Sequence, residues 1–124
     1  MSQHPELLDH VVARFGNRLQ SPPQLTQDAL ALSLENGVQL TVRYAAADAY
    51  SLRWKFQAGE HELEMGIDTA PMHPTLATRP NHLHLADGLA VADPLTRIDA
   101  APADNLSALI EALLRDPQLD VTRS

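Results

Sequence analysis

The residues best suited to chemistry lie in one segment, 68–88, which reads DTAPMHPTLATRPNHLHLADG. It holds three of the six histidines of the chain, His73, His82 and His84, together with three prolines. An imidazole, with an ordinary pKa of about 6.5, can both accept and donate a proton near neutral pH. It is also a common metal ligand. The segment therefore suits proton transfer, a metal site, or a loop whose histidines only hydrogen-bond to it.

Alternation in the second half of the segment predicts how two of these imidazoles are presented. His82 and His84 are two residues apart, so in a strand they point to the same side, while Leu83 and Leu85 point to the core. We therefore expect both imidazoles on the exposed, polar face of a sheet. The prolines should stiffen the connection that brings His73 beside them.

Cleavage of a phosphodiester is one reaction that such a cluster could catalyse. One imidazole takes a proton from a 2′-hydroxyl, a second protonates the leaving oxygen, and arginine stabilises the charged phosphorane. The predicted catalytic residues are His73, His82 and His84, with Asp68 in support and no cofactor. The candidate phosphate-binding residues are Arg43, Arg53, Lys55 and Arg79.

A metal-dependent enzyme is the alternative use of the same segment. Histidine and carboxylate groups are typical ligands of divalent ions such as zinc. The ligands would then be His73, His82, His84 and Asp68.

The basic candidates share a polar face with carboxylates, which gives a less specific interpretation. If residues 58–59 form a tight turn, Lys55 should oppose Glu62 and Arg53 should oppose Glu64. Exposed ion pairs of this kind contribute little to stability. The face is then either a solvated surface or a phosphate-binding surface.

Alternation of apolar and polar residues also predicts the strands that position these groups. The alternating stretches are 30–34, 38–44, 50–56 and 63–67, with a further hairpin around 82–91. Apolar residues three and four apart predict a helix at each end, one starting at Pro5 and one capped by Asp104. The expected fold is α+β: an antiparallel meander of four to six strands, with the N-terminal and C-terminal helices packed on one face.

Two hairpins can be specified further, because paired strand residues must point to the same face. Leu34 should oppose Val38, so residues 35–37 form a three-residue loop with Gly37 in the left-handed conformation. Residues 86–88 should form a second loop of this kind.

The remaining histidines are expected to have no catalytic role. His4 and His10 fall in the first helix and are predicted to lie on the surface. His61 begins a strand beside a turn, where a structural role is expected. No glycine-rich phosphate loop or nucleophile elbow is present.

Composition sets the broad class. A chain of 124 residues and 13.6 kDa is expected to form one domain, with 118–124 as a loose tail. The absence of cysteine excludes disulfides and thiolate metal sites. Neither a signal peptide nor a membrane span is predicted, so a cytoplasmic location is expected. A net charge of −7 argues against a general nucleic-acid coat, so contact with RNA would need a local basic patch.

The histidine segment resembles the signature of the TumE family, through Asp68-x-Ala70-Pro71-x-His73-Pro74-x-x-x-Thr78-x-Pro80-x-His82-x-His84. The similarity extends over residues 38–115, and the chain departs from the pattern at Met72, Arg79 and Asn81. Members are toxins of two-gene toxin–antitoxin modules. The resemblance implies a helix-turn-helix antitoxin as partner, and RNA or ribosome-associated RNA as target. Three functions remain: an RNA-cleaving toxin, a metal-dependent enzyme, or a non-enzymatic interaction module.

Overall fold

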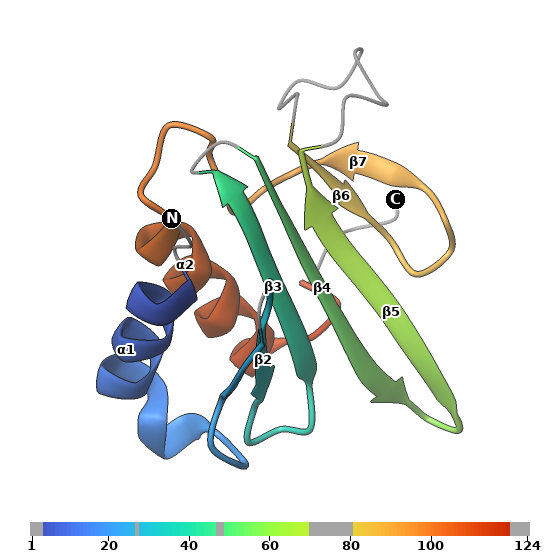
Figure 1. Ribbon diagram of the computed structural model, residues 1–124. Helices are drawn as coiled ribbons and strands as arrows, with labels where there is room; N and C mark the ends of the chain where they lie inside the picture. Colours follow the sequence, from blue (N-terminus) through green and yellow to red (C-terminus); the bar gives the residue numbers. More distant parts are fainter. Residues whose placement is uncertain (1–3, 27, 47–48, 70–80, 120–124) are drawn as a thin grey trace.

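The computed structural model of the protein describes residues 4–26, 28–46, 49–69 and 81–119. These form one seven-stranded antiparallel sheet whose strands are neighbours in sequence order (Figure 1). The strands are β1 (Gln24–Leu25), β2 (Leu30–Ser33), β3 (Gln39–Ala46), β4 (Ala49–Ala58), β5 (His61–Asp68), β6 (His82–His84) and β7 (Ala90–Ala92). The α+β class and the meander are confirmed, while the strand count exceeds the four to six expected.

Two helices, α1 (His4–Phe15) and α2 (Pro102–Arg115), lie together on one side of the sheet (Figure 1). Each buries one stripe, with Leu7 and Val11 on α1 and Leu109 and Leu113 on α2 at most 2% exposed. Full burial of such a side chain contributes about 1.5–3 kcal/mol. The opposite side of the sheet, which we call the outer face, is free to carry polar residues. No helix in the described parts of the chain is long and apolar enough to cross a membrane.

Two features of the helices differ from the predictions. Helix α2 begins at Pro102 with Ala101 as its N-cap, whereas Asp104 lies in the first turn. Proline is favoured at this position because its missing N–H would have no helical partner. The burial of His4 also differs from its prediction. His4, expected at the surface, is 3% exposed, and its Nε2 accepts a hydrogen bond from the Tyr44 backbone N–H at 3.0 Å. The prediction for His4 was wrong because its partner is distant in the sequence.

Two hairpin loops are confirmed. The Leu34 N–H donates to the Val38 carbonyl at 2.8 Å, and Gly37 has φ +91°. The Leu85 N–H donates to the Leu89 carbonyl at 2.8 Å, which closes the loop 86–88. Both loops have three residues and use glycine for the left-handed position.

The register between β4 and β5 was predicted two residues away from its actual position. Ala58 pairs with His61, so the turn consists of Gly59, with φ +66°, and Glu60. Lys55 therefore opposes Glu64, and the partner of Arg53 is Gly66 instead of a glutamate. A shift of two leaves every side chain on the expected face, which is why alternation alone could not reveal it.

Candidate functional site

The candidate site lies on the outer face, where strand pairing aligns polar residues in two rows. Antiparallel neighbours lie about 4.8 Å apart, so paired residues are side by side. The first row consists of Arg43, Ser51, Asp68 and His82. The second consists of Thr41, Arg53, Gly66 and His84.

Asp68 brings the two histidines of β6 together. It is paired directly with His82 and lies diagonally from His84. Its Oδ1 is 3.0 Å from His82 Nε2, and its Oδ2 is 3.1 Å from His84 Nε2. The imidazole rings pack edge to face, with centroids 4.6 Å apart. The predicted convergence of these two imidazoles and Asp68 is therefore found, and we call this group the Asp68 cluster.

The two imidazoles differ in exposure, contrary to the expectation that both would be accessible. The side chain of His82 is 1% exposed and that of His84 is 28% exposed. His82 occupies a central position between Asp68 on β5 and Ala92 on β7, with the ring of His84 against it. His84 is thus the imidazole of this pair that a substrate can reach.

Three of the four candidate phosphate-binding residues lie in the described part of the chain. Arg43, Arg53 and Lys55 are exposed on the outer face, on β3 and β4. Arg43 lines a shallow groove of about 370 Å³, together with Ser51 and Asp68. His73 and Arg79 lie outside the described residues. The structure therefore joins basic side chains to the Asp68 cluster along one surface.

Gly66 is a site residue that the sequence analysis missed. A Cβ atom at this position would lie 3.2 Å from Cγ of Arg53 and 3.3 Å from the Leu52 carbonyl oxygen. The Arg53 side chain therefore runs over Gly66, in the row that continues to His84. A glycine inside an alternating strand was the signal, because it often marks such a close approach.

Replacing Gly66 with alanine is expected to displace the side chain of Arg53, a candidate phosphate-binding residue, and so to weaken the predicted contact with an RNA oligonucleotide by about tenfold, the size of one lost charged hydrogen bond. Gly16→Ala is the matched control, since a Cβ at Gly16 would meet nothing within 4 Å. Filter binding of a labelled oligonucleotide at two salt concentrations measures the effect. Equal affinities for the two variants would contradict this role of Gly66.

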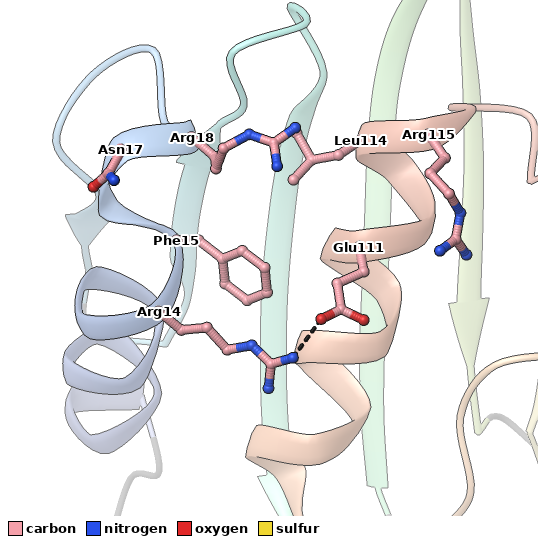
Figure 2. Close-up of a pocket in the computed structure, with 7 residues that line it drawn as sticks. All are labelled: Arg14, Phe15, Asn17, Arg18, Glu111, Leu114 and Arg115. Carbon is pink, nitrogen blue, oxygen red and sulfur yellow. Dashed lines mark hydrogen bonds and ion pairs between the residues drawn. The ribbon is translucent and has the colours of Figure 1, made fainter.

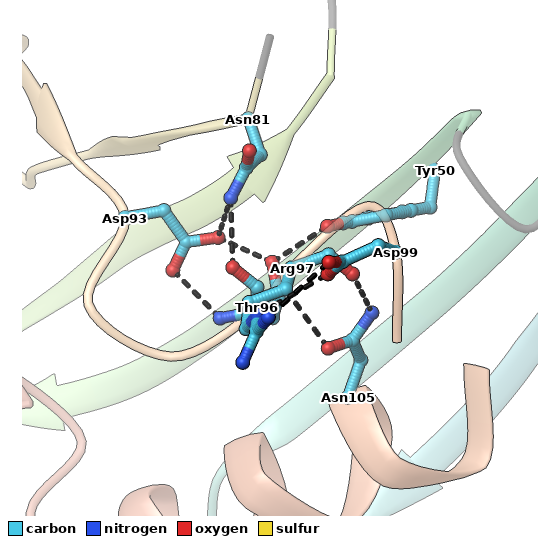
Figure 3. Close-up of polar contacts among 7 residues, drawn as sticks. All are labelled: Tyr50, Asn81, Asp93, Thr96, Arg97, Asp99 and Asn105. Atoms are coloured by element: carbon cyan, nitrogen blue, oxygen red, sulfur yellow. Dashed lines mark hydrogen bonds and ion pairs between the residues drawn. The ribbon is translucent and has the colours of Figure 1, made fainter. Parts of the chain in front are cut away.

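A buried polar network fixes the residue before His82 (Figure 3). The Asn81 side-chain amide donates to Asp93 Oδ2 at 3.0 Å and to the Thr96 carbonyl at 2.8 Å. Asp93 also accepts from the backbone N–H of Leu95 and from both the backbone N–H and the hydroxyl of Thr96. Asn81, a departure from the family pattern, thus anchors the start of β6. This network was not predicted from the sequence.

The network reaches β4 through Tyr50, whose hydroxyl lies 2.7 Å from Thr96 Oγ1. Burial raises the pKa of Tyr50 above its usual range, and nearby Asp93 adds to the rise. Burial likewise raises the pKa of Tyr44, its ring neighbour. Both phenols therefore stay neutral at physiological pH and act as structural groups.

A second groove, of about 500 Å³, lies between the C-terminal ends of α1 and α2 (Figure 2). Arg14, Arg18 and Arg115 line it. Arg14 is paired with Glu111, and Arg18 with Glu35. Arginines at helix C-termini also complement the helix dipole. Two of its three arginines are therefore paired with glutamate, and the groove lies at the helices, away from the Asp68 cluster, so the outer face is the better candidate for phosphate.

The chemistry open to the Asp68 cluster follows from its atoms. The carboxylate can stabilise the protonated form of an accessible imidazole, which suits proton transfer. The ligand atoms of Asp68, His82 and His84 also lie within 4.8 Å of one another, a spacing compatible with a metal ion. Both uses foreseen from the sequence thus retain a structural basis.

Comparison with known proteins identifies the family. Residues 6–118 match the family model described as toxin TumE, which covers almost the entire chain. The search of curated proteins and the search of solved structures found no match. The match confirms the resemblance seen in the histidine segment, and a toxin of this kind implies an antitoxin partner. The chain belongs to the TumE toxin family.

Proposed function

We propose that this toxin cleaves RNA at the Asp68 cluster and is neutralised by a helix-turn-helix antitoxin. One observation carries the proposal: Asp68 holds His82 and His84 at 3.0 and 3.1 Å, on the face that also bears exposed arginines. A carboxylate–imidazole pair can activate a 2′-hydroxyl, and the basic residues beside it can stabilise a phosphorane.

His84 is the general base in this proposal because it is the more exposed imidazole of the pair. Its Nε2 faces Asp68, so we assign proton transfer to Nδ1. His84 removes the 2′-hydroxyl proton, the 2′-oxygen attacks phosphorus, and the 5′-oxygen leaves with a proton. We assign His73 to protonating that oxygen. Buried His82 holds Asp68 in place, so we reassign it from proton transfer to positioning.

Arg43 and Arg53 supply the electrostatic part of the reaction. Both are exposed in the two rows that lead to the cluster, and Lys55 extends the same surface. Their charge compensates locally for the net charge of −7 of the chain. An RNA target therefore has a basic surface to contact, and binding should weaken as salt increases.

Nucleophilic attack by the 2′-oxygen gives a direct test. The purified toxin should cleave an RNA oligonucleotide and leave the same sequence intact when every 2′-hydroxyl is methylated. Methylation removes the proton that His84 must take and blocks the nucleophile. Cleavage of both oligonucleotides at similar rates would exclude the proposed reaction. Cleavage of neither, at concentrations that arrest growth in cells, would exclude RNA cleavage by the toxin alone.

A further inference from the structure

We propose that the Asp68 cluster also binds one divalent transition-metal ion of the zinc type, and that the bound ion blocks proton transfer. The site rests on geometry that is independent of RNA cleavage. Only its inhibitory effect rests on the proposed function. The two parts can therefore fail separately.

The distances suit a shared ion. Zinc lies about 2.0–2.2 Å from imidazole nitrogen and carboxylate oxygen, so neighbouring ligand atoms around it are roughly 3–3.4 Å apart. In the Asp68 cluster the two nitrogen–oxygen distances are 3.0 and 3.1 Å. All the ligand atoms lie within 4.8 Å of one another, so a single ion placed among them is within reach of all three side chains.

The cluster is largely shielded from water on one side. The side chain of Asp68 is 14% exposed and that of His82 is 1% exposed. His84, at 28% exposure, lies on the more open side, where water could complete the coordination. Such an open position is usual in zinc sites that exchange ligands.

The ligands are held by strands and by tight hydrogen bonds. Thr69, next to Asp68, receives a hydrogen bond from the Tyr50 backbone N–H at 3.0 Å through its hydroxyl. Asn81, next to His82, is fixed by Asp93 as described above. Rigid support of this kind lowers the conformational cost of binding an ion.

Metal binding and proton transfer are competing uses of the same atoms. An ion on Nε2 of His84 leaves the only ring proton on Nδ1, where it cannot be exchanged for the proton of a 2′-hydroxyl. The ion also takes the carboxylate of Asp68, which orients the His84 ring in the metal-free toxin. Zinc-bound toxin should therefore be inactive, and removal of the ion by a chelator should restore cleavage.

Isothermal titration calorimetry, in which zinc chloride is added to tag-free full-length toxin, tests the site. We expect one ion per chain, with affinity at least about tenfold weaker in Asp68→Asn and His84→Ala. His61→Ala is the matched control, because His61 is exposed at the far end of β5. His82 is left unchanged because its burial makes a folding defect a second explanation.

Three results would overturn the inference. Absence of binding to the parent, or parent affinity in both Asp68→Asn and His84→Ala, would exclude the site. RNA cleavage that is stimulated by zinc instead of inhibited would exclude the inhibitory role. If the toxin cleaves no RNA, the titration still decides whether the site exists.

Discussion

Toxin carrying His84→Ala should cleave RNA about 10²–10⁴ times more slowly than the parent, the usual contribution of a general base. The loss arises because no other exposed imidazole lies beside Asp68 in the described part of the chain. Asp68→Asn should also slow cleavage, since it removes the carboxylate that lies 3.1 Å from His84 Nε2 and orients the ring. Initial rates at saturating oligonucleotide measure both effects.

Folding and binding must be separated from catalysis in this experiment. His84 is 28% exposed, so alanine should leave the thermal midpoint within a few degrees of the parent. His61→Ala should retain the parent rate. A rate within threefold of the parent for a folded His84→Ala protein would remove His84 from the reaction.

Replacing Asp93 with alanine should lower the free energy of unfolding by about 3 kcal/mol, because several buried donors lose a charged acceptor at once. Asp93 is 4% exposed and accepts from Asn81, from the Leu95 N–H and from Thr96. Urea unfolding followed by the fluorescence of the single tryptophan, Trp54, reports the change, since Trp54 is fully buried.

Asp99→Ala provides the matched comparison for Asp93. Asp99 forms an exposed ion pair with Arg97 at 3.2 Å, and both side chains are more than two-thirds exposed. Exposed pairs contribute about 0–1 kcal/mol. Equal destabilisation by the two substitutions would contradict the structural role of the buried network. Asp93→Ala should also slow RNA cleavage at urea concentrations below the denaturation midpoint, because β6 is then held less firmly although the chain remains folded.

Local rules predicted the parts of the fold that depend on neighbouring residues. Side-chain parity gave the loop between Leu34 and Val38 and the shared orientation of His82 and His84. Parity could not distinguish registers two residues apart, so the partner of Arg53 was predicted as Glu64 instead of Gly66. The strand β1, with two residues, is too short to produce an alternating pattern.

The remaining differences come from contacts between distant parts of the chain. Orientation within a strand places a side chain on a face but does not show how much of that face is covered, as the burial of His82 demonstrates. His4 is buried by pairing with Tyr44, forty positions away. Asn81 reaches Asp93 and Thr96 after a hairpin. Composition and spacing carry little information on such contacts.

The chemical nature of the RNA ends is the most direct test of the central claim, that His84 and Asp68 activate a 2′-hydroxyl on the outer face. Mass spectrometry of a short oligonucleotide cut by the toxin, with chelator present, should show a 2′,3′-cyclic phosphate on one fragment and a 5′-hydroxyl on the other. Fragments ending in a 3′-hydroxyl and a 5′-phosphate would show attack by water and contradict the claim.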